Sequence, residues 1–147
     1  LARVPGRGAN TLSEALKDKD PNIRIAALRT AREQTPDSIA ALEALVRDPS
    51  PAVRREVALA LQGNRSPQAT ALWVELARQH DGKDRWYLEA LGIGADGHWD
   101  ETLTAWLKAA GDSWNTPGGR DVIWRSRAKA TPALLVKIVK DPSTPES

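Results

Sequence analysis

Two stretches of the sequence, "LSEALKDKDPNIRIAALRTA" (residues 12–31) and "LEALVRDPSPAVRREVALAL" (residues 42–61), are related by a shift of 30 residues. The shift aligns positions of the same chemical type: Leu12 with Leu42, Pro21 with Pro51, and Arg24 with Arg54. A shift of 31 extends the pattern to "KDRWYLEALG" (residues 83–92), and "LLVKIVKDPSTP" (residues 134–145) repeats its first half. Similarity at a fixed period predicts stacked units of secondary structure rather than one globular core.

Each unit is predicted to contain two helices. Apolar residues recur at helical spacing in the first helix of a unit, most clearly at Trp99, Leu103, Trp106, Leu107 and Ala110. The second helix opens with a proline, which suits a first turn, and Asp20 or Ser50 stands before it as an N-cap. No segment alternates as a strand would. The sequence therefore predicts an all-α fold, a right-handed α-α superhelix of about four helix pairs.

The turns between the helices carry a family resemblance. "DKDPNIR" and "DPSPAVR" resemble the D-P-x-x-(V/I)-R turn of HEAT and HEAT-like repeats, although the period of 30 is shorter than the ~40–47 residues of full HEAT units. The resemblance implies that the turn aspartate and the arginine that follows it form a stacked ladder between neighbouring repeats. The expected members are Asp20 with Arg24, Asp48 with Arg54, Asp81 or Asp84 with Arg85, and Arg120 as the next rung.

The repeats divide the chain into similar blocks. We expect a single domain over residues 1–147, with repeats at approximately 10–34, 36–64, 66–95 and 98–130 and a partial repeat at 131–147. Leu1 to Val4 read as the last turn of a helix, and residues 134–145 stop at the turn where a second helix would begin. We therefore expect the chain to be an interior fragment of a larger protein.

Composition limits the possible functions. The chain has 147 residues and no cysteine, which excludes disulfides, thiolate catalysis and covalent haem attachment in this segment. No apolar run approaches the ~20 residues that cross a bilayer, so we expect no membrane insertion by this segment. The formal net charge of +2 is spread evenly, with 11 basic and 8 acidic side chains in residues 1–65, and this even spread speaks against nucleic acid as a partner.

The stretch "GDSWNTPGGRDVIWRSR" (residues 111–127) resembles a ligand-binding loop in composition. Its glycine spacing matches neither the dinucleotide-binding nor the P-loop pattern. We interpret it as an inter-helix turn enlarged by several residues, in which Gly111 ends one helix and Thr116-Pro117 or Gly119 starts the next. Binding of a ligand by this loop remains open. Three of its residues form a possible partner surface: Trp114, Arg125 and Arg127.

The remaining candidates for chemistry have structural explanations. Trp73, Trp99 and Trp106 lie on apolar helical faces and are predicted to be core, whereas Trp114 lies in a loop and is the tryptophan we most expect to be exposed. His80 and His98 stand in polar turns without metal-ligand spacing. The sequence predicts no catalytic, cofactor-binding or metal-binding residue, and hence no enzyme in this segment.

A closer resemblance covers most of residues 72–128. "HDGKDRWYLEALGIGADGHWDETLTAWL" (residues 80–107) and "GDSWNTPGGRDVIWRSRA" (residues 111–128) resemble the HEAT region of large bacterial exported proteins described as membrane-bound dehydrogenase-like or c-type haem-binding. The resemblance implies a periplasmic or otherwise extracytoplasmic location and a parent protein in redox chemistry. Any redox activity belongs to other parts of such a parent, because this chain has no cysteine for a haem.

These observations favour a non-catalytic scaffold that contacts protein, either neighbouring domains of the parent chain or a separate partner. The alternative is a HEAT-like nucleic-acid-binding or DNA glycosylase-type domain, which would combine basic residues and tryptophans on one concave face. A similarity to phycobilin-lyase repeats rests on the repeat alone.

Overall fold

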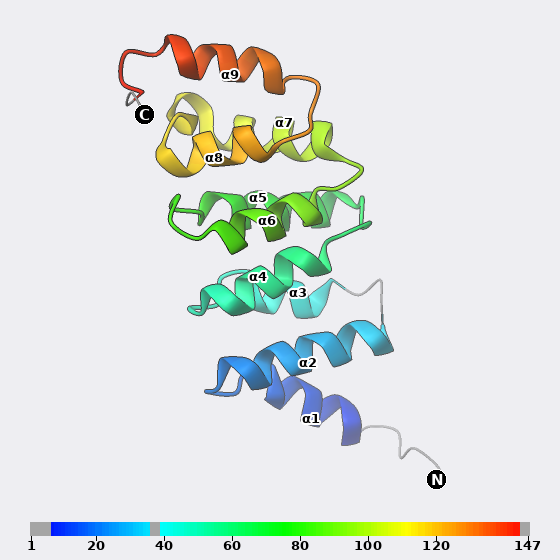
Figure 1. Cartoon of the computed structure of the whole chain (residues 1–147). Helices are drawn as coiled ribbons and strands as arrows, with labels where there is room; N and C mark the ends of the chain where they lie inside the picture. The colour runs from blue at the N-terminus through cyan, green and yellow to red at the C-terminus, as the bar shows by residue number, and fades with distance from the viewer. Residues whose placement is uncertain (1–6, 36–38, 145–147) are drawn as a thin grey trace.

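The computed structural model describes residues 7–35 and 39–144. Over these residues the chain forms nine α-helices and one 3₁₀ helix (η1) and no strand (Figure 1). The elements are α1 (Arg7–Ala15), α2 (Pro21–Gln34), α3 (Ala40–Leu45), α4 (Pro51–Ala60), α5 (Pro67–Arg78), α6 (Arg85–Gly94), α7 (Trp99–Ala110), η1 (Gly111–Trp114), α8 (Pro117–Arg125) and α9 (Thr131–Lys140). The predicted helical turn at Leu1–Val4 lies outside the described residues.

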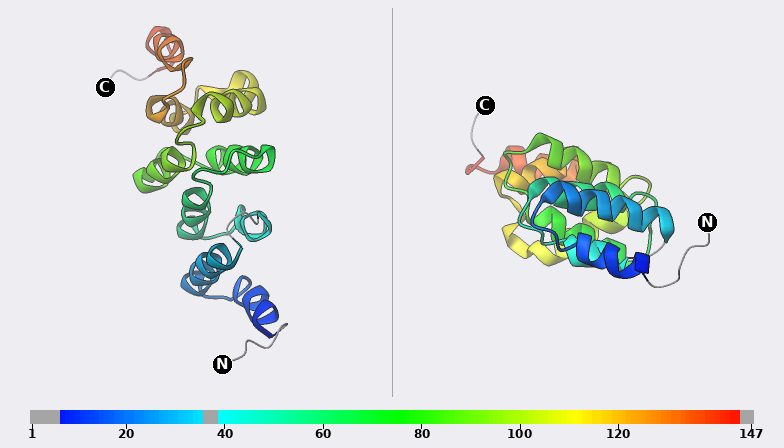
Figure 2. Two further views of the ribbon diagram at one scale, coloured as in Figure 1. Left: turned by 90° about the vertical axis from the view of Figure 1, so that its right-hand side faces the viewer. Right: turned by 90° about the horizontal axis from the view of Figure 1, so that it is seen from below.

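The helices form two columns (Figure 2). The second helices α2, α4, α6 and α8 stack in chain order in one column, while α5 and α7 stack in the other. Helix α9 packs on α8. Among the described residues each pair thus packs mainly against its neighbours in the stack, which defines a helical-repeat solenoid. The prediction of an all-α solenoid with about four helix pairs is confirmed, and the first pair begins at Arg7, earlier than residue 10.

The helix starts follow the sequence signals, with one difference in detail. Pro21 and Pro51 are the first residues of α2 and α4, and the Asp20 carboxylate accepts a hydrogen bond from Asn22 N. Ser50 occupies the N-cap position of α4 but makes no side-chain cap bond. Its backbone N–H instead donates to Asp48 Oδ1 at 2.8 Å, so an aspartate two residues earlier orders this turn.

The core runs along the stack and is filled by aliphatic residues, three tryptophans and Tyr87. Trp73, Trp99 and Trp106 are buried, as predicted. Trp73 is central, because its indole N–H donates to Leu91 O at 2.8 Å and its ring meets Trp99 edge to face with centroids 5.7 Å apart. One side chain thereby connects α5, α6 and α7.

The two central second helices, α4 and α6, come close together at a glycine. A Cβ atom at Gly94 of α6 would lie 2.4 Å from the carbonyl oxygen of Ala58 in α4 and 3.4 Å from Trp73 Cδ1. The absence of a side chain at Gly94 therefore lets the α6 backbone reach the α4 backbone directly.

We expect Gly94→Ala to destabilise the chain by about 1–2 kcal/mol, because separating two backbones costs more than the helix propensity gained. Chemical denaturation followed by circular dichroism measures this change. Gly92→Ala is the matched control in the same helix. The atoms nearest to its Cβ would be those of the Arg125 guanidinium, a flexible end that can move at the cost of its partly exposed pair with Glu89. Equal effects of the two substitutions would contradict the close-approach interpretation.

Candidate protein-interaction surface

The second helices carry most of the arginines. Helices α2, α4, α6 and α8 contain eight arginines and four acidic residues, whereas α1, α3, α5 and α7 contain three basic and five acidic residues. The even spread of charge along the sequence thus becomes an uneven one between the two columns of the stack. The surface formed by α2, α4, α6 and α8 is called the second-helix face below.

Exposed aromatic residues lie on helices of this face. Trp86 on α6 is 73% exposed and Trp124 on α8 is 64% exposed, whereas Trp114 is half-buried. The expectation that Trp114 is the exposed tryptophan was therefore wrong. It packs against the core from η1, and two helical tryptophans face solvent instead.

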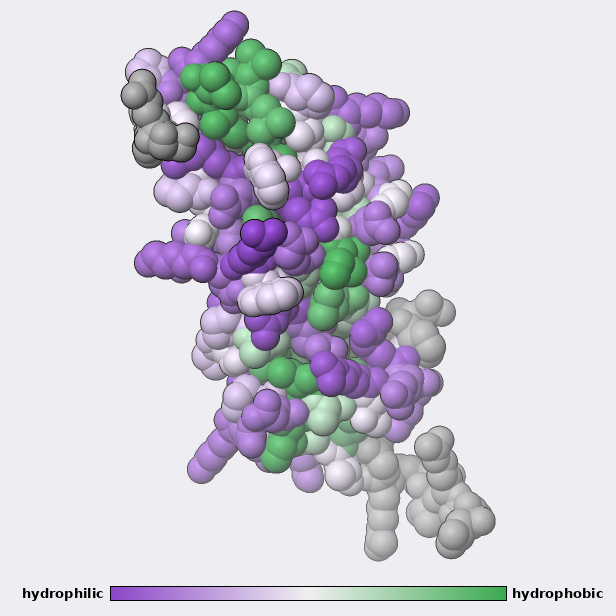
Figure 3. All heavy atoms as spheres, viewed as in Figure 1, coloured by the Kyte–Doolittle hydropathy of each residue, from purple (hydrophilic) through white to green (hydrophobic). Residues whose placement is uncertain are grey.

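A groove of about 460 Å³ lies between α4 and α6, lined by Arg55, Leu59, Trp86, Glu89, Ala90 and Ile93. Its walls are mainly apolar, with one basic and one acidic side chain at the edges. Figure 3 shows this side of the molecule, where hydrophobic patches are separated by hydrophilic side chains. Exposed aromatic and aliphatic side chains beside charges are typical of protein-binding surfaces.

Ion pairs connect consecutive second helices. Arg29 on α2 pairs with Glu56 on α4 at 2.8 Å, and Arg125 on α8 pairs with Glu89 on α6 at 3.0 Å. Arg125, which the sequence analysis placed on a possible partner surface, thus contacts the neighbouring helix. Arg127 is exposed, and its guanidinium donates to the carbonyls of Arg125 and Ser126.

The ladder joins neighbouring turns, as the resemblance implies, but Arg24 has a different carboxylate partner from the one expected. Arg24 donates two hydrogen bonds of 2.7 Å to the carboxylate of Asp48 in the next turn, and its Nη1 also reaches Asp18 O. The Asp20 carboxylate accepts from Asn22 N and not from the Arg24 guanidinium, so the expected pairing of the Asp20 and Arg24 side chains was wrong. The rung therefore joins two repeats.

At the following turn the equivalent arginine, Arg54, makes different contacts. Arg54 donates to Asp48 O at 2.6 Å rather than to the carboxylate, and its guanidinium lies 5.7 Å from the centre of the Tyr87 ring. The Tyr87 hydroxyl donates to Leu76 O. A cation–π contact thus replaces the second ion pair.

The last predicted rungs have other roles. Asp84 caps α6 by accepting from Tyr87 N, and Arg85 is exposed with no ion-pair partner in the described part of the chain. Arg120 donates to Asn115 Oδ1 at 3.3 Å, and Asn115 in turn donates to Asp141.

The electrostatics of the Arg24–Asp48 rung favour the charged pair. Burial raises the pKa of the Asp48 carboxyl. Hydrogen bonds from Arg24 and from the Ser50 N–H, with the charges of Arg24 and Arg54, outweigh burial and hold that pKa below its ordinary value. The carboxylate is therefore ionised at neutral pH.

The glycine-rich stretch forms the turn between α7 and α8. Gly111 ends α7 with a φ of 56°, Thr116 accepts from Gly119 N, and Pro117 is the first residue of α8, as expected. The turn is not enlarged, however. It spans residues 111–116, as long as the turn at 79–84 and one residue longer than the turn at 46–50.

The two histidines are buried in packing roles. His80 Nε2 lies 3.1 Å from Asp121 Oδ2 and its ring stacks on Tyr87, while His98 Nδ1 lies 3.1 Å from Asp96 O. Within residues 7–35 and 39–144, no group of three histidine, aspartate or glutamate side chains is placed to hold a metal ion. No helix in these ranges is long and apolar enough to span a bilayer.

The stacked helix pairs define an all-α helical-repeat protein. Comparison with known families agrees, because residues 9–92, more than half of the chain, match the HEAT repeats family. The chain belongs to the HEAT repeat family. HEAT repeats generally serve as protein-interaction scaffolds, and no curated protein and no solved structure matches the chain.

Proposed function

We propose that this chain is a non-catalytic scaffold that binds protein through its second-helix face. The observation that carries the proposal is the exposure of Trp86 beside the apolar groove between α4 and α6. An exposed tryptophan next to an apolar groove offers a large area that a partner can bury and a concave surface that an anchor side chain can fill.

The charges of the second-helix face suit a partner with acidic side chains. Arg29 and Arg125 are each paired with a glutamate, whereas Arg55 and Arg85 have no ion-pair partner among the described residues. A partner that places an apolar side chain in the groove and acidic side chains beside these two arginines would bury the apolar surface and neutralise the positive charge.

The proposed location of the protein rests on the sequence resemblance. The resemblance of residues 80–128 to exported dehydrogenase-like or haem-binding proteins supports a location outside the cytoplasm. In that setting the partner is a neighbouring domain of the same parent chain or a second extracytoplasmic protein, and the redox chemistry belongs to the parent.

Site-specific photo-crosslinking in the native host tests the proposal. A photoreactive residue at Ile93, in the groove, should give a defined crosslinked product, and Trp86→Ala should abolish that product. The control is the same residue at Thr104, exposed on α7. Equal crosslinking from both positions, or none from Ile93, would reject the second-helix face as the binding surface.

Binding of nucleic acid is the second candidate, and the excess of arginines on the second-helix face favours it. A gel-shift titration with duplex DNA over a range of salt distinguishes the two candidates, since phosphate contacts weaken steeply as salt rises. We expect no retardation at physiological salt, because two of the arginines are already neutralised by Glu56 and Glu89.

A further inference from the structure

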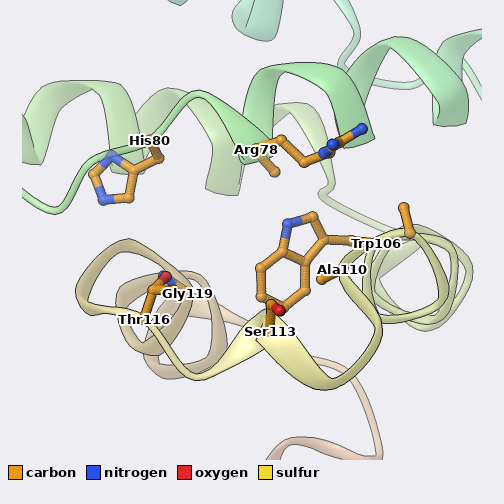
Figure 4. Close-up of a pocket in the computed structure, with 9 residues that line it drawn as sticks. Arg78, His80, Trp106, Ala110, Ser113, Thr116 and Gly119 are labelled. Atoms are coloured by element: carbon orange, nitrogen blue, oxygen red, sulfur yellow. The ribbon is translucent and has the colours of Figure 1, made fainter.

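A second pocket lies where the fourth helix pair is open. Helix α7 packs mainly on α5 and η1, and α8 packs on α6 and α9, so these two helices pack little on each other. A pocket of about 370 Å³ remains there, beneath the end of α5 (Figure 4). Its polar lining consists of Arg78, His80, Trp106, Ser113 and Thr116.

Trp106 brings an unused hydrogen-bond donor to this pocket. Its side chain is buried, yet no group among the described residues accepts a hydrogen bond from its Nε1–H. The other central tryptophan, Trp73, donates to Leu91 O. Figure 4 shows the nitrogen edge of the Trp106 ring turned toward α5, the helix that carries Arg78. The Trp106 Nε1 atom is not one of the fully buried atoms without a partner, so this donor keeps access to solvent and is open to a ligand in the pocket.

Arg78 supplies positive charge on the same side of the pocket. The nearby acidic groups are already engaged: Glu75 accepts from Arg47 at 2.9 Å, and Asp121 accepts from His80. Hydrogen bonding by Arg47 lowers the pKa of Glu75, and Arg78 contributes only a weaker charge effect. The guanidinium of Arg78 has no ion-pair partner in the described structure, so it is available to an anion.

The other walls are suited to an apolar body with one polar end. Ala77, Ala109 and Ala110 contribute methyl groups beside the Trp106 ring. The Thr116 hydroxyl oxygen accepts from Gly119 N, which leaves its own proton free to donate, and Ser113 adds a second hydroxyl. Arg78, Trp106 and the two hydroxyls can thus all donate, and no carboxylate lines the pocket.

We propose that this pocket binds a small organic carboxylate. Its carboxylate accepts from the Trp106 indole N–H and from the Arg78 guanidinium, and its apolar body lies against the indole ring and the alanine methyl groups. An arginine with a second convergent donor is a common arrangement for carboxylates, and the volume is within the range of small-molecule sites.

Nuclear magnetic resonance of the six tryptophan indole N–H groups tests the proposal, with the Trp106 signal identified by its loss in Trp106→Phe. Sodium benzoate, titrated at constant ionic strength, should shift the Trp106 signal saturably and more than the other five. Arg78→Gln should weaken this binding by about tenfold or more. The control is Arg65→Gln, which removes an exposed arginine before the start of α5 and should leave the affinity unchanged.

Two further probes test whether both the carboxylate and the apolar body of the ligand are needed. Benzamide keeps the ring and loses the charge, so it should bind at least about tenfold more weakly than benzoate. Inorganic phosphate keeps the charge and loses the apolar body, and it should also bind more weakly. The proposal is overturned if benzoate gives no saturable shift, if Arg78→Gln has no effect, or if benzamide or phosphate equals benzoate.

Discussion

Replacement of Trp73 by alanine is expected to lower the free energy of unfolding by about 4 kcal/mol. Trp73 is fully buried, and it contacts α6 through Leu91 O and α7 through Trp99. The substitution leaves a cavity at the meeting point of three helices and removes the hydrogen bond. Urea denaturation followed by circular dichroism measures the loss, which is a large part of the stability of an ordinary domain.

Trp86→Ala is the matched control for this result. Trp86 is on the next helix and is 73% exposed, so its removal should change the stability by no more than about 0.5 kcal/mol. Comparable losses from the two substitutions would mean that the stack does not depend on a core centred on α5, α6 and α7.

The second large effect is expected at the Arg24–Asp48 rung. Asp48→Ala removes the partner of a largely buried guanidinium and the acceptor for Ser50 N. Breaking a buried pair leaves an uncompensated charge. We expect a loss of about 3 kcal/mol, at the lower end of the usual range because Arg24 keeps its bonds to backbone carbonyls.

The pKa shift of Asp48 predicts how the stabilisation by the Arg24–Asp48 pair depends on pH. The pKa of Asp48 is lower in the folded chain than its ordinary value, so the unfolded chain binds a proton more readily. The stabilisation is fully present above the unfolded pKa of about 3.9 and is lost as the pH falls through the folded pKa. The stability difference between the native chain and Asp48→Ala should therefore shrink below about pH 4.

Arg47→Ala provides the comparison for an exposed ion pair. Arg47 and Glu75 also join two repeats, but the Arg47 side chain is 75% exposed. Its removal should leave the denaturation midpoint nearly unchanged, because solvent screens such pairs. A loss as large as that of Asp48→Ala would show that burial does not decide the strength of these contacts.

The sequence was sufficient to predict the fold and most helix ends, because these depend on local signals. Proline at a first turn, glycine at a helix end and apolar spacing act within a few residues, and they correctly placed Pro21, Pro51, Gly111 and Thr116. The same spacing correctly assigned Trp73, Trp99 and Trp106 to the core.

Contacts between repeats were harder to predict. Arg24 has carboxylates in its own turn and in the next one, and only the stacking of the helices selects Asp48. For the exposed tryptophans a signal was present. The shift of 31 residues that aligns Arg54 with Arg85 also aligns Arg55 with Trp86, which places Trp86 at a position occupied by a charged residue.

The Gly94 contact sets the spacing of α4 and α6. With no side chain between the two backbones at this point, any added atom has to move the helices apart. The groove lined by Leu59 and Ile93 lies on the same two helices, so the spacing set at Gly94 also sets the width of the groove.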